Sequence, residues 1–451
     1  MTQPAPLPAA FISRMRAQLG PEAEDYLAAM ARPYVRGLRR NPRKPAPCNG
    51  TDGIGSLLSP IPWEPNGFYL AVDSPAGSLP IHEAGAYYLQ EPSAMLPARV
   101  LAPAPGERVL DLCAAPGGKS TQLADMLNGE GLLVCNEPVF SRAQILSRNL
   151  ERMGVSNALV SCADPAQLAD AWPCAFDAIL VDAPCSGEGM FRRHPEARAE
   201  WSESAPAGCA ARQLRILESA FTMLRPGGRL VYSTCTLNTE ENEGVIEAFL
   251  QKHGELSTVN FSVPMGKGAY ALSQNGMFRA LPHQLEGEGH FLALLAKDSC
   301  TANAAKTAFA PAESRLATAS GPLLQAYNEF CQSRPFPCPN AVFGDTLIHA
   351  PDLPPLRGIK ILRAGLQLGM LKGKVFAPDH ALALALSAPY PLEAIPLNAT
   401  QARAYHAGEV LLVDTQWHGY ALVTYGGFAL GFVKSSNGQL KNHYPKGLRR
   451  P

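Results

Sequence analysis

Two cysteines lie where a thiol could take part in chemistry. Cys185 follows an apolar run in "VDAPCSGEGMF" and Cys235 follows another in "VYSTCT", so each is predicted to lie where a buried strand ends. Ligands of open parallel sheets bind outside these carboxyl ends, and there backbone donors and positive charge favour a thiolate. Ordinary burial is the simpler explanation for Cys135, Cys162 and Cys209. We therefore predict that Cys185 and Cys235 face one cleft.

The loop "DLCAAPGGKS" has the features of a cofactor site, because Gly117 and Gly118 let the backbone approach a ligand closely. A phosphate-binding P-loop would need glycine where Cys113 stands, and the dinucleotide fingerprint G-x-G-x-x-G is absent. An S-adenosylmethionine loop is the third interpretation. It predicts that Glu137 binds the ribose hydroxyls and that Asp164 meets the adenine amino group, each from a strand end. Taken alone, Glu137 is more simply a helix N-terminal acid and Asp164 an N-cap.

A thiol beside a methyl donor indicates covalent catalysis on a pyrimidine. Carbon 5 of cytosine is a poor nucleophile, but addition of a thiolate to carbon 6 makes it enamine-like, so that it can attack a sulfonium methyl group. Asp182 is placed to act as an acid near N3, and a base must later remove the carbon 5 proton. This chemistry leaves open whether Cys185 or Cys235 attacks.

The elements that must position these residues alternate between apolar strands and amphipathic helices along residues 108–297. This alternation predicts an α/β fold with a doubly wound, mostly parallel sheet. Strands are expected at 108–115, 131–137, 158–164, 176–185, 227–236 and 290–297.

The segments that flank this core are predicted to form separate modules. Residues 1–90 carry two helical stretches, 11–19 and 22–30, and two strand-like stretches, 34–42 and 67–72, which together indicate a small α+β module. From about residue 340 onward, short strands and turns alternate, and the Gly-rich spacing indicates a compact β-rich C-terminal module, where Trp417, Tyr420 and Tyr425 are predicted to belong to the core. The predicted divisions are 1–90, a catalytic domain at 91–298, a linker and intermediate segment at 299–378, and 379–451.

The charge distribution is uneven although the 451-residue chain has a formal net charge of 0. Residues 1–50 carry 8 basic and 3 acidic residues, 431–451 carry 5 basic and no acidic residues, and 101–250 carry 12 basic and 19 acidic residues. Basic ends around an acidic middle suit a polyanionic partner held by flanking modules, although simple solvation of the ends is the plainer alternative.

Several classes of protein are not expected from this sequence. The N-terminal stretch lacks the charge and apolar pattern of a secretory signal, and no apolar run reaches transmembrane length. The 11 cysteines include no Cys-x-x-Cys pair, so neither a metal site nor a disulfide scaffold is predicted. We expect a cytoplasmic protein with reduced thiols and no membrane contact.

The motifs "AYYLQEPSAMLPA", "DLCAAPGGK", "DAPCSGEGMFRR" and "YSTCT", in this order, resemble the NOL1/NOP2/Sun family of RNA 5-methylcytosine methyltransferases, most strongly over 85–297. The bacterial RsmF-like branch, which acts on small-subunit ribosomal RNA, is the most similar. The resemblance implies a Rossmann-like class I methyltransferase core, an N-terminal RNA-binding module and a PUA-like C-terminal domain. It also implies that Cys235 is the nucleophile and Cys185 assists product release. The cofactor-binding residues that it implies are Cys113, Ala114, Ala115, Pro116, Gly117, Gly118, Lys119, Glu137, Asp164 and Asp182.

The expected activity is methylation of carbon 5 of a cytosine in small-subunit ribosomal RNA, with S-adenosyl-L-methionine as cofactor and ribosomal RNA or the small ribosomal subunit as partner of a monomer. Alternatives are a tRNA cytosine methyltransferase and a ribosome-assembly factor that keeps the fold without turnover. Residues 190–194, "MFRRH", either stack on a flipped base and contact phosphates or form a surface loop with one buried aromatic. His194 itself is expected to be a surface or hydrogen-bonded histidine.

Overall fold

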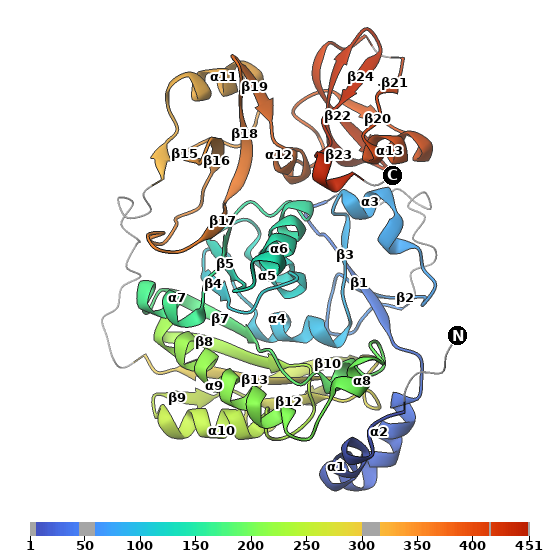
Figure 1. Ribbon diagram of the computed structural model, residues 1–451, viewed down its shortest axis with the longest axis vertical. Coiled ribbons are helices and arrows are strands. Elements are labelled where there is room, and N and C mark those ends of the chain that lie inside the picture. Colours follow the sequence, from blue (N-terminus) through green and yellow to red (C-terminus); the bar gives the residue numbers. More distant parts are fainter. Residues whose placement is uncertain (1–5, 45–58, 300–315, 415, 450–451) are drawn as a thin grey trace.

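A mostly parallel nine-stranded sheet forms the centre of the computed structural model, which describes residues 6–44, 59–299, 316–414 and 416–449 (Figure 1). Its order is β12-β13-β8-β7-β4-β5-β6-β17, with β9 beside β13. Strands β4 to β8 run parallel, and β12, β13 and β17 run antiparallel to their neighbours. The predicted doubly wound α/β core is confirmed. The strands are β4 (Arg108–Asp111), β5 (Leu132–Asn136), β6 (Ala158–Ser161), β7 (Phe176–Asp182), β8 (Leu224–Thr234), β9 (Leu256–Thr258), β12 (Met277–Ala280), β13 (His290–Lys297) and β17 (Ile361–Ala364).

Helices cover both faces of this sheet because successive strand residues point to opposite sides. Val109 and Leu133 pack with α4, α5 and α6, while Leu110 and Ile179 pack with α7, α9 and α10. Both clusters are almost fully buried, which explains the continuous apolar runs in the sequence. The helices are α4 (Leu96–Leu101), α5 (Gly118–Leu127), α6 (Phe140–Arg152), α7 (Pro165–Ala171), α8 (Ala197–Glu200), α9 (Ala205–Met223) and α10 (Glu243–Lys252).

The N-terminal part contains the predicted helices and strands. A three-stranded sheet of order β2-β1-β3 lies against the catalytic core, and the buried Arg39 ties it to Asp125 of α5. Helices α1 and α2 belong to a different apolar cluster from this sheet. In that cluster Phe11 of α1 contacts Phe191, with ring centroids 5.1 Å apart. The elements are α1 (Ala9–Leu19), α2 (Ala23–Met30), β1 (Arg36–Arg40), β2 (Gly67–Leu70), α3 (Pro80–Glu83) and β3 (Tyr87–Leu89).

The segment after the core is folded wherever it is described, and it contains short strands from residue 341 onward, as the alternating pattern predicted. Residues 300–315, at the start of the predicted linker and intermediate segment 299–378, lie outside the described residues. The following chain forms a five-stranded sheet of order β14-β15-β16-β18-β19, and β17 leaves it to pair with β6 of the central sheet. Its elements are β14 (Ala317–Thr318), α11 (Gly321–Cys331), β15 (Ala341–Phe343), β16 (Thr346–His349), β18 (Leu366–Lys372), β19 (Val375–Pro378) and α12 (His380–Ala385).

The C-terminal module is a second five-stranded sheet, of order β20-β22-β23-β24-β21, as the β-rich pattern predicted. It lies beside the preceding sheet at the end of the molecule remote from α1 and α2 (Figure 1). No described helix combines the length and apolar character needed to cross a bilayer. The elements are β20 (Ala394–Pro396), α13 (Ala399–Ala407), β21 (Leu411–Leu412), β22 (Gly419–Tyr425), β23 (Phe428–Ser436) and β24 (Gln439–Asn442); a separate hairpin beside the core contains β10 (Ser262–Gly266) and β11 (Ala269–Leu272).

Candidate active site

A cavity of about 370 Å³ opens at the carboxyl edge of the central sheet. The loop after β4 forms one wall, and residues from the ends of β7, β8 and the start of β13 form the others. This is the edge at which open α/β sheets bind ligands. The predicted residues that line the cavity are Cys113, Ala114, Ala115, Pro116, Gly118, Lys119, Asp182 and Cys235.

The loop 113–119 has the backbone shape expected of a cofactor cradle. Gly117 caps the N-terminus of α5 with φ 112°, a conformation that a side chain would strain. A Cβ on Gly118 would lie 3.3 Å from the Tyr88 ring, so glycine keeps the wall open. The buried Oδ1 of Asp111 at the cavity has no hydrogen-bond partner among the described residues. A helix N-terminus and an unpartnered carboxylate oxygen fit a polar ligand such as S-adenosylmethionine.

Glu137 and Asp164 lie at the ends of β5 and β6 but do not line this cavity. The buried Glu137 accepts a hydrogen bond from Val139 N at 2.9 Å and pairs with Arg142 at 3.2 Å. Arg142 also donates to the Ala115 carbonyl oxygen at 3.2 Å, which links Glu137 to the cofactor loop. Asp164 is exposed and caps α7 by accepting from Ala166 N at 2.9 Å, which is the simpler role considered from the sequence.

Asp182 is held as a carboxylate by its neighbours. Its Oδ2 lies 2.9 Å from Lys119 Nζ, and its Oδ1 accepts a hydrogen bond from Ser233 Oγ at 2.8 Å. Burial alone would raise the pKa of the Asp182 carboxyl, but Lys119 and then His290 outweigh it and hold the pKa well below its usual value. An ionised carboxylate accepts hydrogen bonds and has no proton to donate. This differs from the expectation that Asp182 is the acid near N3.

The two thiols meet. Cys185 Sγ lies 3.3 Å from Cys235 Sγ, although the residues come from different strand ends and are 50 positions apart. The hydrogen bond to Cys235 and burial, with a contribution from Glu241, raise the pKa of the Cys185 thiol well above its usual value. The thiolate form of Cys185 is therefore disfavoured. The two cysteines come together as predicted, but only Cys235 is among the residues that line the cavity.

A buried carboxylate that the sequence analysis did not single out joins the two thiol loops. Glu188, three residues after Cys185, accepts hydrogen bonds from Leu237 N at 3.0 Å and Asn238 N at 3.1 Å, and it pairs with Arg14 of α1. Beside it, Gly189 N donates to the Cys235 carbonyl oxygen at 2.7 Å. The "SGEGM" part of the motif therefore holds the Cys235 loop in place.

Glu241 makes a second connection between the same loops. Its fully buried carboxylate accepts from Ser186 N at 3.0 Å, Gln213 Nε2 at 2.8 Å and Asn238 Nδ2 at 2.8 Å, and it also accepts from Ser186 Oγ. Because Ser186 is adjacent to Cys185 and Asn238 follows the Cys235 turn, Glu241 fixes one thiol relative to the other. Buried carboxylates with complete hydrogen bonding hold such loops rigidly.

Some residues of the "MFRRH" stretch pack inside the protein and others line the cavity, so each of the two interpretations applies to part of it. Phe191 is fully buried against Phe11, and Arg192 is buried in an ion pair with Glu288 at 2.9 Å, so both are packing residues. A phosphate contact by Arg192 is therefore contradicted, because its guanidinium is already occupied. Met190, Arg193 and His194 line the cavity; His194 is 49% exposed and 3.0 Å from Glu196.

His290 is a cavity residue that the sequence analysis missed. It begins β13, which runs antiparallel to β8 with Phe291 opposite Thr234, so the first residue of β13 lies at the carboxyl edge of β8. Only 3% of His290 is exposed, and its Nε2 lies 3.6 Å from Asp182 Oδ1. The rule that ligands bind at the carboxyl ends of parallel strands would have identified His290 if it had been extended to the first residue of a neighbouring antiparallel strand.

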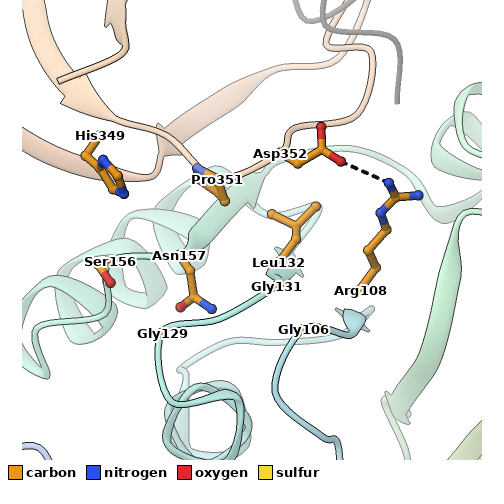
Figure 2. Close-up of a pocket in the computed structure, with 10 residues that line it drawn as sticks. All are labelled: Gly106, Arg108, Gly129, Gly131, Leu132, Ser156, Asn157, His349, Pro351 and Asp352. Atoms are coloured by element: carbon orange, nitrogen blue, oxygen red, sulfur yellow. Dashed lines mark hydrogen bonds and ion pairs between the residues drawn. The ribbon is translucent and has the colours of Figure 1, made fainter. Parts of the chain in front are cut away.

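Other features lie away from this site. A second cavity of about 370 Å³ opens at the amino ends of β4 and β5, where Arg108 pairs with Asp352 at 2.9 Å (Figure 2). It contains none of the predicted site residues. The C-terminal aromatics Trp417, Tyr420 and Tyr425 are each partly buried against apolar clusters, so their main role is packing.

Known proteins share this architecture from end to end. Family models match at 7–92 (N-terminal domain of 16S rRNA methyltransferase RsmF), 98–296 (16S rRNA methyltransferase RsmB/F), 329–386 (RsmF rRNA methyltransferase first C-terminal domain) and 393–450 (Methyltransferase RsmF PUA domain). The chain is 34% identical to Ribosomal RNA small subunit methyltransferase F of Klebsiella pneumoniae (strain 342), over 98% of this chain and 96% of that one. The corresponding protein of Citrobacter koseri is also 34% identical, with 98% and 96% coverage.

Solved structures show the same core fold. A methyltransferase homolog protein from Pyrococcus horikoshii is 30% identical with a TM-score of 0.54, covering 64% of this chain and 94% of that one. NSun6 from the same organism has a TM-score of 0.55 at 23% identity, with 64% and 98% coverage, and supports the fold alone. The class I methyltransferase fold, with its N-terminal domain and PUA-like C-terminal domain, is therefore shown.

Proposed function

Because the chain belongs to the RsmF family of S-adenosylmethionine-dependent methyltransferases of small-subunit ribosomal RNA, we propose that it methylates carbon 5 of a cytosine in that RNA through a covalent bond between Cys235 and carbon 6. One observation carries the proposal: the 3.3 Å contact between the Cys185 and Cys235 sulfurs, beside the cavity that the 113–119 loop lines. A methyltransferase that acts on an already nucleophilic atom needs no thiol, whereas carbon 5 of cytosine does.

The residues proposed to hold the cofactor are the 113–119 loop, with Glu137 and Asp164 at the next strand ends and Asp182 beyond them. When bound, S-adenosylmethionine supplies an electrophilic methyl group. The N-terminus of α5 and the open backbone at Gly118 favour a charged, polar ligand at this wall. Glu137 is the residue proposed for the ribose, because its carboxylate is buried next to the loop and oriented by Val139 N.

The environments of the two thiols favour different roles for them. The raised pKa of Cys185 disfavours its thiolate and with it nucleophilic attack by this residue, whereas Cys235 lines the cavity. We assign the attack on carbon 6 to Cys235. During product release the Cys185 thiol can donate its hydrogen bond to the Cys235 sulfur as that sulfur leaves as a thiolate.

Asp182 is assigned to binding of the target base. Its ionised carboxylate, paired with Lys119, can accept a hydrogen bond from the exocyclic amino group of cytosine. Uracil has an oxygen at that position and would be repelled. Asp182 therefore contributes to selection of cytosine and to its orientation over Cys235.

The flanking modules are proposed to deliver the RNA. The division of roles follows the predicted boundaries, with RNA contacts from 1–90 and 379–451, catalysis from 91–298, and 299–378 joining them; a monomer acting in the cytoplasm suits this arrangement. The net basic charge of residues 1–50 and 431–451 supports it. The exposed Lys434 and Lys441 are available to phosphate at the C-terminal end, whereas Arg39 and Lys44 of the N-terminal part are buried.

Bisulfite sequencing of ribosomal and transfer RNA from a deletion strain tests the proposal. A cytosine in small-subunit RNA should lose its protection, and the wild-type gene but not Cys235→Ala should restore it. Loss of protection in a tRNA instead would favour the tRNA alternative. Unchanged protection everywhere, with a subunit-assembly defect that Cys235→Ala repairs, would favour an assembly factor.

A further inference from the structure

His290 lies within the reacting centre defined by Lys119, Asp182 and Cys235. All four residues line the same cavity, and His290 reaches it from the start of β13, across from the end of β8. Only 4% of the side chain is exposed, so the surrounding protein fixes its orientation. A buried histidine at a catalytic edge has either a structural or a chemical role, and its hydrogen bonds distinguish the two.

Both ring nitrogens of His290 face oxygen atoms. Nδ1 lies 3.1 Å from the Gly289 carbonyl oxygen, and Nε2 lies 3.6 Å from Asp182 Oδ1. A carbonyl oxygen and a carboxylate oxygen both accept hydrogen bonds, so a ring N–H is the group that matches each of them.

The distance between His290 and Asp182 leaves room for a third group. At 3.6 Å the pair is too far apart for a good hydrogen bond, and the buried Nε2 has no other partner among the described residues. The other charged neighbours are engaged elsewhere: Lys119 pairs with Asp182, and Glu288 pairs with Arg192 and accepts from Val35 N. An unpartnered donor beside an occupied carboxylate points to a ligand atom that accepts a hydrogen bond.

We propose that His290 is a catalytic residue whose Nε2–H donates to N3 of the target cytosine and supplies the proton that the addition step requires. This inference rests on the proposed function. As the Cys235 sulfur bonds to carbon 6, the C5=C6 electron pair moves to form C4=C5, and the C4=N3 pair moves to N3. N3 then takes the proton from Nε2. Carbon 5 then bonds to the methyl group of S-adenosylmethionine through the C4=C5 pair, and the N3 lone pair restores C4=N3. When a base removes the carbon 5 proton, the C–H pair forms C5=C6, the Cys235 sulfur leaves as a thiolate, and the protonated N3 returns its proton to Nε2.

The same arrangement discriminates between pyrimidines. Cytosine offers an acceptor at N3 and a donor at its amino group, which matches a donor at His290 and an acceptor at Asp182. Uracil offers the opposite pattern, so both contacts would be repulsive. His290 therefore replaces Asp182 as the acid that the chemistry requires, since the ionised Asp182 has no proton to give.

The test is the pH dependence of adduct formation with a target RNA that carries 5-fluorocytosine, in the full-length protein with S-adenosylmethionine. The fluorine cannot be removed as a proton is, so the adduct accumulates and its rate of formation can be measured on denaturing gels. The wild type should give a bell-shaped profile, because Cys235 must lose a proton and His290 must keep one. His290→Gln should lower the maximal rate by about 10²- to 10⁴-fold and remove the alkaline fall.

The control is His349→Gln, which changes a histidine at the end of β16 that does not line this cavity and should keep the bell shape. Calorimetric binding of S-adenosylmethionine to His290→Gln should remain at the wild-type level, which shows that the pocket is folded. A His290→Gln profile that is lower but still bell-shaped would overturn the proposal and leave His290 a structural role. If the wild-type protein forms no adduct at all, the proposed function itself fails, which is a distinguishable result.

Discussion

At the residue scale, burial sets the protonation of the groups around the cavity. Asp182 stays ionised because Lys119 lies 2.9 Å away, and Cys185 stays protonated because it shares a hydrogen bond with Cys235. Burial would lower the pKa of Lys119, but the neighbouring Asp182 outweighs burial and raises this pKa above its ordinary value. The site therefore holds an ionised carboxylate at Asp182, an ammonium group at Lys119 and a thiol at Cys185 whose pKa is raised.

Asp111 provides a residue-scale prediction. Burial, partly offset by the Ser120 hydroxyl at 2.6 Å, raises the pKa of Asp111 from 3.8 to about 7. Because the folded-state pKa lies above the unfolded one, the protonated form stabilises the fold below about pH 4, and this contribution is lost as pH rises through 7. At about 1.4 kcal/mol for each pKa unit, the loss is on the order of 4 kcal/mol. Asp111→Asn should therefore lose less stability than the wild type between pH 4.5 and 8 in urea unfolding.

The control for that comparison is Asp345→Asn, a change at a surface carboxylate in the β15–β16 turn, which should keep the wild-type pH dependence. Equal pH dependence in Asp111→Asn and the wild type would show that Asp111 is ionised at neutral pH in spite of its burial.

The sequence identified the residues with distinctive chemistry but not their charge states. Cys185, Cys235 and Lys119 were predicted at the site because their motifs end apolar strands, and they line it or lie against it. The acid role expected of Asp182 depended on its protonation, which is set by a lysine 63 positions away in the chain. His290 was not predicted because only the carboxyl ends of parallel strands were considered as ligand sites.

At the element scale, the two thiol-bearing loops are held together by carboxylates rather than by apolar packing. Glu188 binds the backbone that follows Cys235, and Glu241 binds the residue that follows Cys185. Each acid comes from the loop opposite the one it holds, so the loops cannot move independently. Their separation controls the 3.3 Å contact between the sulfurs.

Gly189→Ala tests this coupling. A Cβ at position 189 would lie 2.7 Å from the Cys235 carbonyl oxygen, so the Cys235 loop must shift, while φ at this glycine is ordinary and adds no strain. Since a shift of about 1 Å in a reacting group can lower a rate by about 10²-fold, methylation should fall by that order. Single-turnover methylation assays and thermal unfolding should show a large loss of rate with a small loss of stability.

Gly208→Ala is the matched control, because a Cβ there meets nothing within 4 Å and the residue lies within α9. It should keep the wild-type rate. Equal rates in the two alanine variants would mean that the Cys235 loop does not need this position.

Most elements were predictable because their apolar periodicity is strong. The strands of the core and the helices α1 and α2 follow from local pattern alone, since each buries one face or both. Short strands were expected from about residue 340 onward, but their pairing was not, and β14 at 317–318 was not predicted. Their place in the sheet depends on partners far away in the chain.

At the scale of the whole molecule, β17 joins the C-terminal half to the catalytic core. It pairs with β6, and its buried Arg363 forms an ion pair with Glu151 of α6. Lys44, from the N-terminal part, donates to the Leu384 carbonyl oxygen of α12. Nothing in the local sequence of β17 marks it as the last strand of a sheet that begins 250 residues earlier, so this link could not be predicted from pattern.

The basic C-terminal module gives a prediction about RNA binding. Lys434 and Lys441 are exposed partners on β23 and β24, so neutralising them should not disturb the fold. If they contact phosphates, Lys434→Gln/Lys441→Gln should weaken binding to small-subunit RNA and reduce the slope of log K against log salt by about 1–2. Filter binding across a range of salt concentrations measures that slope.

Lys252→Gln is the control, since Lys252 is an exposed lysine on α10, where it pairs with Glu218. It should keep the wild-type slope. An unchanged slope in the double variant would assign the charges of β23 and β24 to solvation.

The most direct test of the account separates the two thiols with denaturing gels of the protein, its target RNA and S-adenosylmethionine. Cys235→Ala should form no covalent adduct and no product, because the attack on carbon 6 is lost. Cys185→Ala should accumulate a protein–RNA band, because addition and methyl transfer proceed while release is slow, and Cys338→Ala, a change at an exposed cysteine, should behave as the wild type. A band with Cys235→Ala and none with Cys185→Ala would reverse the assigned roles. Methylation by Cys235→Ala without any adduct would contradict covalent catalysis altogether.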